Sequence, residues 1–82
     1  MSQINVTLRY FAMLRERAGV ESEDLSTSSE TPKELYAELR ETHGFSLEAT
    51  ELRVAVNGEF AELDDTLTEG DEIAFIPPVS GG

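Results

Sequence analysis

The sequence predicts one α+β domain, a mixed sheet of four to five strands with one main helix packed on one face. Three observations lead to this prediction. Stretches in which apolar and polar residues alternate, the pattern of half-buried strands, occur in both halves of the chain. One helical stretch between them has clear start and stop signals. A chain of 82 residues has room for one small core, and a single long helix can cover only one face of a sheet.

The first 27 residues predict two strands separated by a short helix. Residues 3–10 alternate cleanly between apolar and polar side chains, as a half-buried strand does. In residues 11–18 the apolar side chains follow helical spacing, and Gly19 is a natural helix stop. Residues 20–27 are assigned to a second strand, although their alternation is poor and their charge is high.

The main helix is predicted from Thr31 to His43. Thr31-Pro32-Lys33-Glu34 is a capping box, in which the Thr31 hydroxyl accepts from the Glu34 amide and the Glu34 side chain reaches back. A proline at the first helical position and Gly44 after the last one complete the signals. The residues expected to face the core are Leu35 and Leu39, with Tyr36 at the margin.

Three more strands are predicted after this helix. Residues 52–57 alternate, and Asn57-Gly58 is the strongest hairpin signal in the chain, because a type I′ turn needs positive φ at both positions. Residues 59–63 then return as a short strand, and residues 64–69 form a loop with room for one helical turn. The final strand, residues 71–76, ends at two prolines, which have no amide donor for the ladder.

The final strand is apolar on both faces, with Ile73 and Phe75 on one face and Ala74 and Ile76 on the other. This pattern is typical of a central strand. Because one helix covers only one face, one of the two pairs should belong to an exposed apolar patch, the usual mark of a partner surface. The alternative is that a loop or the short helix covers this pair.

The acidic composition narrows the classes of partner. The formal net charge is −11, from 17 acidic and six basic residues. Such a surface repels phosphate backbones, which argues against nucleic-acid binding, and it favours a partner with a basic surface. The alternative is that the acidity serves solubility alone, for example in a salty cytoplasm.

Cysteine is absent, and targeting signals are not found. Without a thiol the chain has no disulfide, no thiolate metal site and no cysteine nucleophile, and it cannot carry sulfur as a cysteine persulfide. The N-terminus does not have the pattern of a signal peptide, and no apolar run approaches membrane-spanning length. We therefore expect a cytoplasmic protein without membrane contact.

No set of residues predicts an active site within the domain. His43, the only histidine, is expected at the end of the main helix, where a cation suits the helix dipole, and a structural role is favoured. The carboxylates between Asp64 and Glu72 do not have the spacing of a calcium loop, so no metal site is expected. Gly81-Gly82 is too short for a phosphate-binding loop.

The C-terminal tail, residues 77–82, is therefore the candidate for chemistry, attached to a domain of residues 1–76. Once it is activated as an acyl-adenylate, the α-carboxylate of Gly82 is open to attack by a sulfur or nitrogen nucleophile. Glycines without Cβ atoms can enter a narrow channel, and Pro77-Pro78 stiffen the base of the tail. Extended, the tail reaches about 20 Å, enough for a partner's active site. The alternative is that the terminal glycines are merely disordered.

Three parts of the sequence resemble the small subunit of molybdopterin synthase, a family of ubiquitin-like sulfur carriers with the β-grasp fold. The first is Tyr10-Phe11-Ala12 with Arg15-Glu16, and the second is Val56-Asn57. The third is the ending Gly70-Asp71-Glu72-Ile73-Ala74-Phe75-Ile76-Pro77-Pro78-Val79-Ser80-Gly81-Gly82. The similarity spans essentially the whole chain and its C-terminal motif is highly specific, whereas residues 20–50 contribute little to it.

The resemblance implies a ubiquitin-like β-grasp fold and a role in molybdenum cofactor biosynthesis. An adenylating, ubiquitin-activating-like enzyme would use ATP on the Gly82 carboxylate, and a sulfur donor would convert it to a thiocarboxylate. Inside the large catalytic subunit of molybdopterin synthase, the tail would give this sulfur to cyclic pyranopterin monophosphate. The chain itself would then be a non-catalytic carrier with no permanently bound cofactor.

The resemblance also implies which residues carry this function. Gly82 would be the thiocarboxylate carrier and Gly81 the residue that passes the channel. The residues expected to contact the partner are Pro77, Pro78, Val79 and Ser80 in the tail, and Phe75, Phe60 and Arg15 in the docking surface.

Three other functions remain open from the sequence. A sulfur carrier of the thiamine pathway also ends in Gly-Gly but lacks the Pro-Pro approach. A ubiquitin-like modifier would be joined through Gly82 to lysines of other proteins, and chains built on this protein itself would use Lys33, its single lysine. An acidic binding module would use no C-terminal chemistry, and it alone would tolerate a residue appended after Gly82.

Overall fold

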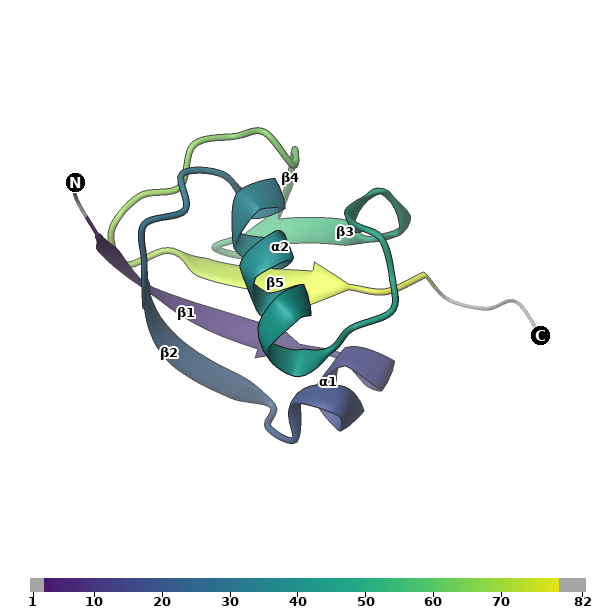
Figure 1. Cartoon of the computed structure of the whole chain (residues 1–82). Helices are drawn as coiled ribbons and strands as arrows, with labels where there is room; N and C mark the ends of the chain where they lie inside the picture. Colours follow the sequence, from purple (N-terminus) through teal and green to yellow (C-terminus); the bar gives the residue numbers. More distant parts are fainter. Residues whose placement is uncertain (1–2, 79–82) are drawn as a thin grey trace.

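The computed structural model describes residues 3–78, which form one five-stranded mixed sheet with the main helix packed across one face (Figure 1). In chain order the elements are β1 (Ile4–Tyr10), α1 (Ala12–Ala18), β2 (Ser22–Thr27), α2 (Pro32–His43), the 3-10 turn η1 (Ala49–Glu51), β3 (Arg53–Val56), β4 (Glu59–Ala61) and β5 (Glu72–Ile76). The predicted α+β class and the predicted order of elements are confirmed.

The last strand, β5, is the centre of the sheet, as its two-sided apolar pattern predicts. The strand order is β2-β1-β5-β3-β4. β5 pairs in parallel with β1 and antiparallel with β3, while β2 and β4 form the two edges. The register pairs Tyr10 with Phe75 and Arg53 with Ile76, so the ladder ends one residue before the prolines. The chain therefore leaves β5 from the middle of the sheet.

The signals at the two ends of α2 act as predicted, with one difference. Thr31 Oγ1 accepts a 3.2 Å hydrogen bond from the Glu34 amide, and Gly44 ends the helix with a φ of 73°. The Glu34 carboxylate reaches back one residue further than a capping box requires and accepts from the Glu30 amide at 2.8 Å. The segment before α2 is therefore fixed together with its first turn.

The core lies between α2 and the covered face of the sheet. Tyr36, predicted at the helix margin, is instead buried, with 1% of its surface exposed and its ring 5.2 Å from that of Phe75. Burial is tolerated because its hydroxyl donates to the Leu47 carbonyl at 2.9 Å. The buried apolar residues are Val6, Leu8, Tyr10, Leu14, Leu35, Tyr36, Leu39, Phe45, Leu52, Val54, Leu67, Ile73 and Phe75.

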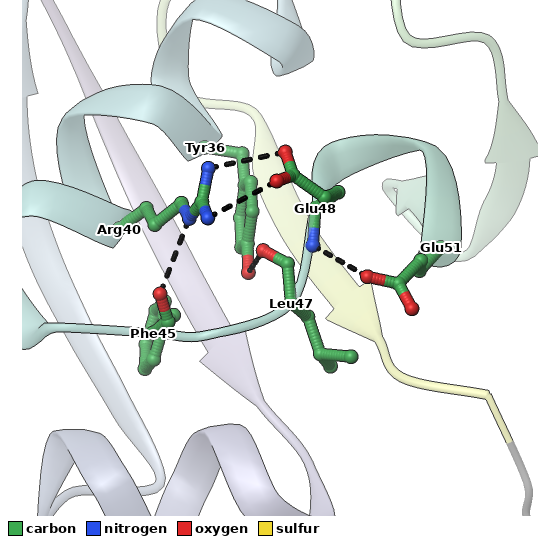
Figure 2. Close-up of polar contacts among 6 residues, drawn as sticks. All are labelled: Tyr36, Arg40, Phe45, Leu47, Glu48 and Glu51. Atoms are coloured by element: carbon green, nitrogen blue, oxygen red, sulfur yellow. Dashed lines mark hydrogen bonds and ion pairs between the residues drawn. The ribbon is translucent and has the colours of Figure 1, made fainter.

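The segment between α2 and β3 is fixed by side chains of the helix (Figure 2). Arg40 donates to the Phe45 carbonyl at 3.2 Å and makes hydrogen bonds of 3.1 and 3.3 Å with the two oxygens of the Glu48 carboxylate. Glu48 and Glu51 form a capping box around η1. η1 leads directly into β3. These contacts therefore fix the start of β3, where Arg53 pairs with Ile76 at the end of β5.

The predicted hairpin forms, with φ of 54° at Asn57 and 86° at Gly58. Its return strand β4 ends at Ala61, two residues earlier than predicted. The chain leaves the sheet there and bonds to the start of α2, where the Leu63 carbonyl accepts from the Lys33 amide at 2.9 Å. The loop that follows contains turns and no helical turn.

Candidate functional site

The root of the C-terminal tail lies at the end of the sheet where α1 begins and β3 starts (Figure 1). Pro77 is buried and Pro78 is exposed, so the chain emerges between them. The predicted carrier residues Gly81 and Gly82 lie outside the described residues, as do Val79 and Ser80. The site is therefore described through the surface that surrounds the tail root.

The sheet face opposite α2 carries an apolar cluster, which was one of the two outcomes expected from the pattern of β5. Ala74 and Ile76 of β5 share this face with Ala55 of β3 and Phe60 of β4. The first three are half-buried, whereas 70% of Phe60 is exposed. We call these four residues the open-face patch. A half-buried apolar cluster that ends in an exposed aromatic ring is typical of a partner surface.

Two arginines border the open-face patch, and the strand register places both on the same face of the sheet. The guanidinium of Arg53 lies over the Phe60 ring at 5.5 Å. The guanidinium of Arg9 lies 6.0 Å from the centre of the Phe11 ring and 3.8 Å from the Glu72 carboxylate. The surface around the tail root is thus apolar in its middle, and its borders carry the two arginines together with the Glu72 carboxylate, which shares this face of β5.

Of the three residues predicted for the docking surface, only Phe60 belongs to the open-face patch. The expectation for Phe75 is wrong, because its side chain is completely buried and packs on Tyr36 in the core. Arg15 is exposed on α1, beside Val20, and is not part of the patch. On this surface, Ile76 takes the position that the sequence analysis gave to Phe75.

Sequence reasoning missed Ile76, Arg9, Phe11 and Arg53 as site residues. Alternation along the last strand put Ile76 and Phe75 on opposite faces, but alternation does not say which face the helix covers. For the two arginines a signal was present, because each occupies a polar-face position of its strand. What remained unknown was that these positions flank β5.

His43 joins three elements of the fold. Its Nε2 lies 3.1 Å from the Glu23 carboxylate, which also accepts a 2.6 Å hydrogen bond from the Tyr10 hydroxyl. Burial, followed by the hydrogen bond and the negative charge of Glu23, raises the pKa of Tyr10 well above its ordinary value. The three side chains tie the end of α2 to β1 and β2, which is a structural arrangement.

The acidic turn before β5 is likewise part of the fold. The Asp71 carboxylate accepts from the Thr68 amide at 2.8 Å, from the Thr68 hydroxyl at 3.0 Å and from the Asn57 side chain at 3.0 Å. Burial alone raises the pKa of Asp71, but these hydrogen bonds outweigh burial and leave the pKa below its ordinary value.

Among residues 3–78, no three His, Cys, Asp or Glu side chains are grouped as metal ligands. No helix in this described range is long and apolar enough to cross a membrane.

Comparison with known sequences identifies relatives over nearly the whole chain. The model of the ThiS family matches residues 8–82. A molybdopterin synthase sulfur carrier subunit from Haemophilus influenzae is 38% identical over 76 residues, which cover 89% of this chain and 94% of that protein. A human protein of the same name is 40% identical over 82 residues, covering 94% of this chain and 93% of that protein.

Solved structures share the fold. SAMP1 from Haloferax volcanii matches with a TM-score of 0.77 and 30% identity, covering 95% of this chain and 99% of that one. A chain of the complex of subunits 1 and 2 of the Helicobacter pylori molybdopterin-converting factor matches with a TM-score of 0.64 and 30% identity, covering 96% and 100%. The ubiquitin of Caldiarchaeum subterraneum has the same fold, with a TM-score of 0.64 at 14% identity over 99% and 100% of the two chains. On these matches the chain belongs to the ThiS family and has the ubiquitin-like β-grasp fold that the sequence resemblance implied.

Proposed function

We propose that this chain is the sulfur carrier subunit of molybdopterin synthase and that it carries sulfur on the carboxylate of Gly82. The observation that carries the proposal is the position of β5. This strand is paired on both sides and continues directly into Pro77 and Pro78 beside the open-face patch. A tail that starts from a central strand has a fixed origin, so less orientational freedom is lost when a partner takes it up.

The chemistry needs no side chain of this domain. An adenylating enzyme of the ubiquitin-activating kind transfers AMP from ATP to the Gly82 carboxylate and releases pyrophosphate. A sulfur donor then displaces AMP, and the product is a C-terminal thiocarboxylate. Because Gly81 and Gly82 have no Cβ atoms, the acyl carbon stays open to the incoming nucleophile. The absence of cysteine agrees with a carrier whose sulfur is held at the C-terminus.

The tail with its C-terminal thiocarboxylate then enters the active site of a large catalytic subunit. There the thiocarboxylate gives its sulfur to cyclic pyranopterin monophosphate. The open-face patch supplies docking contacts for this subunit, with Phe60 at its exposed edge. The likeness to a chain of the two-subunit Helicobacter pylori factor supports such an assembly. ATP acts on the activating enzyme and is not a resident cofactor of this chain.

Deletion of Gly82 tests the proposal. In a strain that has lost its own copy of the gene, the full chain should restore molybdoenzyme activity and the chain without Gly82 should not. A chain extended by one residue at its N-terminus is the matched control, because it alters length and leaves the C-terminal carboxylate unchanged. Normal molybdoenzyme activity with the shortened chain, in a strain without a second carrier gene, would contradict the proposal.

The intact mass of the protein purified from its own cells gives the direct evidence. We expect a species heavier by the exchange of one oxygen for sulfur, mapped to Gly82 and lost on alkaline hydrolysis. Co-purification with the large catalytic subunit would then assign the carrier to the pterin pathway. If the chain carried a thiocarboxylate and loss of the gene caused a thiamine requirement, the carrier would belong to the thiamine pathway instead.

A protein modifier is the second candidate, favoured by the likeness to the small archaeal modifier SAMP1 of Haloferax volcanii. In that function the activated Gly82 carboxylate forms an isopeptide bond with a lysine of another protein. Growth of a chain on this protein would use the side chain of Lys33, which is exposed near the start of α2. Abundant Gly82–lysine isopeptides, with a plain carboxylate on the free chain, would favour the modifier over the sulfur carrier.

A further inference from the structure

Two arginine–phenylalanine pairs stand on either side of β5. The Arg53 guanidinium lies over Phe60 at 5.5 Å, and the Arg9 guanidinium lies 6.0 Å from Phe11. The two rings are large apolar groups that remain exposed, by 70% and 40%. One pair belongs to β3 and β4, and the other belongs to β1 and the residue that follows it. The same arrangement thus occurs on both borders of the open-face patch.

A guanidinium that lies over a ring keeps N–H donors that the ring does not use. Those donors fit a carboxylate as a bidentate pair. Among residues 3–78, no carboxylate lies within ion-pair distance of Arg53, and Arg9 has only the long contact to Glu72, in which both side chains are half-exposed. Both guanidinium groups therefore keep N–H donors that are available to an anionic partner group.

Within residues 3–78, neither of these two side chains donates a hydrogen bond to the main chain. Arg17 and Arg40 donate to main-chain carbonyls at the end of α2 and just after it, at His43 and Phe45, so their presence follows from the structure of that segment. Arg9 and Arg53 instead lie over exposed rings. In a chain with a net charge of −11, two cations placed around the open-face patch indicate that the partner surface that binds there is negatively charged.

We infer that Arg9 and Arg53 determine specificity for the large catalytic subunit, which presents an apolar surface to the open-face patch and one carboxylate to each arginine. This inference rests on the proposed function and adds the chemistry of the partner's surface. With β5 between them, the strands that carry the arginines lie about 10 Å apart, so the two carboxylates belong to separate points on the partner. A partner with cations at these points is rejected by like-charge repulsion.

The sign of a charge substitution separates this local pairing from general attraction. Replacing both arginines by glutamine makes an acidic chain still more acidic. Long-range attraction to a partner that is basic overall would then grow, and binding would tighten. Pairing with two facing carboxylates predicts the opposite, because each partner carboxylate would lose its counter-charge on docking.

The experiment measures the binding of the full chain to the purified large catalytic subunit of the same organism, by calorimetry at low and high salt. Arg9→Gln/Arg53→Gln should weaken binding at least about tenfold. Arg53→Lys, which keeps the charge and loses the planar fork, should weaken it by less. Lys33→Gln removes one positive charge on the helix side of the sheet and is the matched control, so it should not weaken binding.

Each outcome decides between defined alternatives. Unchanged or tighter binding of the folded double variant, with normal binding of the unmodified chain, would overturn the inference and leave the proposed function intact. If Lys33→Gln weakened binding as much as the double variant does, binding would depend on the net charge of the chain and not on the two arginines. That result would also overturn the inference. If the unmodified chain itself did not bind the large subunit, the proposed function would fail, and the inference with it. Circular dichroism on each variant establishes that the fold is kept.

Discussion

At the scale of the residue, neighbouring positions of β5 have opposite roles. Phe75 has no exposed surface and packs against Tyr36, whereas Ile76 is half-buried and belongs to the open-face patch. The same contrast separates the two phenylalanines of the central and edge strands. Phe75 is part of the core, and Phe60 is an exposed ring held beside Arg53. We therefore expect stability and recognition to depend on different aromatic side chains of one sheet.

Alanine substitutions at these two positions should separate stability from binding. Phe75→Ala leaves a cavity between α2 and the sheet and should lower the free energy of unfolding by about 3–5 kcal/mol. Phe60→Ala should change it by less than about 0.5 kcal/mol, because the ring is mostly in water. Phe60→Ala should nevertheless weaken binding to the large subunit at least about fivefold, since exposed aromatic anchors dominate such interfaces. Urea denaturation and calorimetry measure the two effects, and equal losses of stability would contradict the surface position of Phe60.

At the scale of the element, both helices end at a glycine in the left-handed region, with φ of 82° at Gly19 and 73° at Gly44. The two ends differ in what surrounds them. A Cβ atom at Gly19 would meet nothing within 4 Å, whereas one at Gly44 would lie 3.2 Å from the Arg17 guanidinium. That guanidinium donates to the His43 carbonyl at 3.2 Å, so it is part of how α2 ends.

Gly44→Ala should therefore destabilise the domain more than Gly19→Ala. Each substitution places a Cβ in left-handed backbone and should cost about 1 kcal/mol. At Gly44 the Arg17 side chain must also shift, which weakens its hydrogen bond to the His43 carbonyl and adds up to about 1 kcal/mol. Urea denaturation of the two variants gives the comparison. Equal losses would show that Arg17 is displaced without cost and that its hydrogen bond does not stabilise the end of α2.

At the scale of the molecule, the net charge of −11 acts against the folded state. Like charges are brought together on folding, and the three ion pairs found within residues 3–78 involve mainly exposed or half-exposed side chains. Such exposed pairs contribute little stability. Self-repulsion of the acidic surface should therefore dominate the electrostatics of folding.

The melting temperature should accordingly rise with salt. Between 0.01 and 1 M ionic strength the screening length falls from about 30 Å to about 3 Å, which weakens repulsion between exposed carboxylates. Thermal unfolding followed by circular dichroism measures the effect, and sodium and potassium chloride should act alike because both screen equally. A melting temperature that falls with salt would mean that ion pairs outweigh the repulsion.

Binding to the large subunit should respond to salt in the opposite way. Salt should weaken the pairing of Arg9 and Arg53 with the partner's carboxylates while it stabilises the fold.

Much of the fold could be predicted from the sequence because its signals are local. Thr31 and Gly44 mark the ends of α2, Asn57-Gly58 fixes the hairpin, and the two prolines end the last strand. Each of these depends on the conformation of a few adjacent residues, which the sequence specifies directly. The two-sided apolar pattern of β5 also predicted its central place, since side chains of neighbouring strands flank those of a central strand on both faces.

The sequence by itself therefore determined both helices, the order of the five strands along the chain, the central strand and the Gly-Gly ending that points to C-terminal chemistry, but not the 3-10 turn η1. Only the tertiary structure decided which face of β5 the helix covers, and with it that Phe75 is core and Ile76 is surface. It also decided that Tyr36 is buried against the segment after α2, and that Arg9 and Arg53 meet around the same strand. These outcomes depend on contacts between residues far apart in the chain, and periodicity within one element carries no information about which other element packs against it.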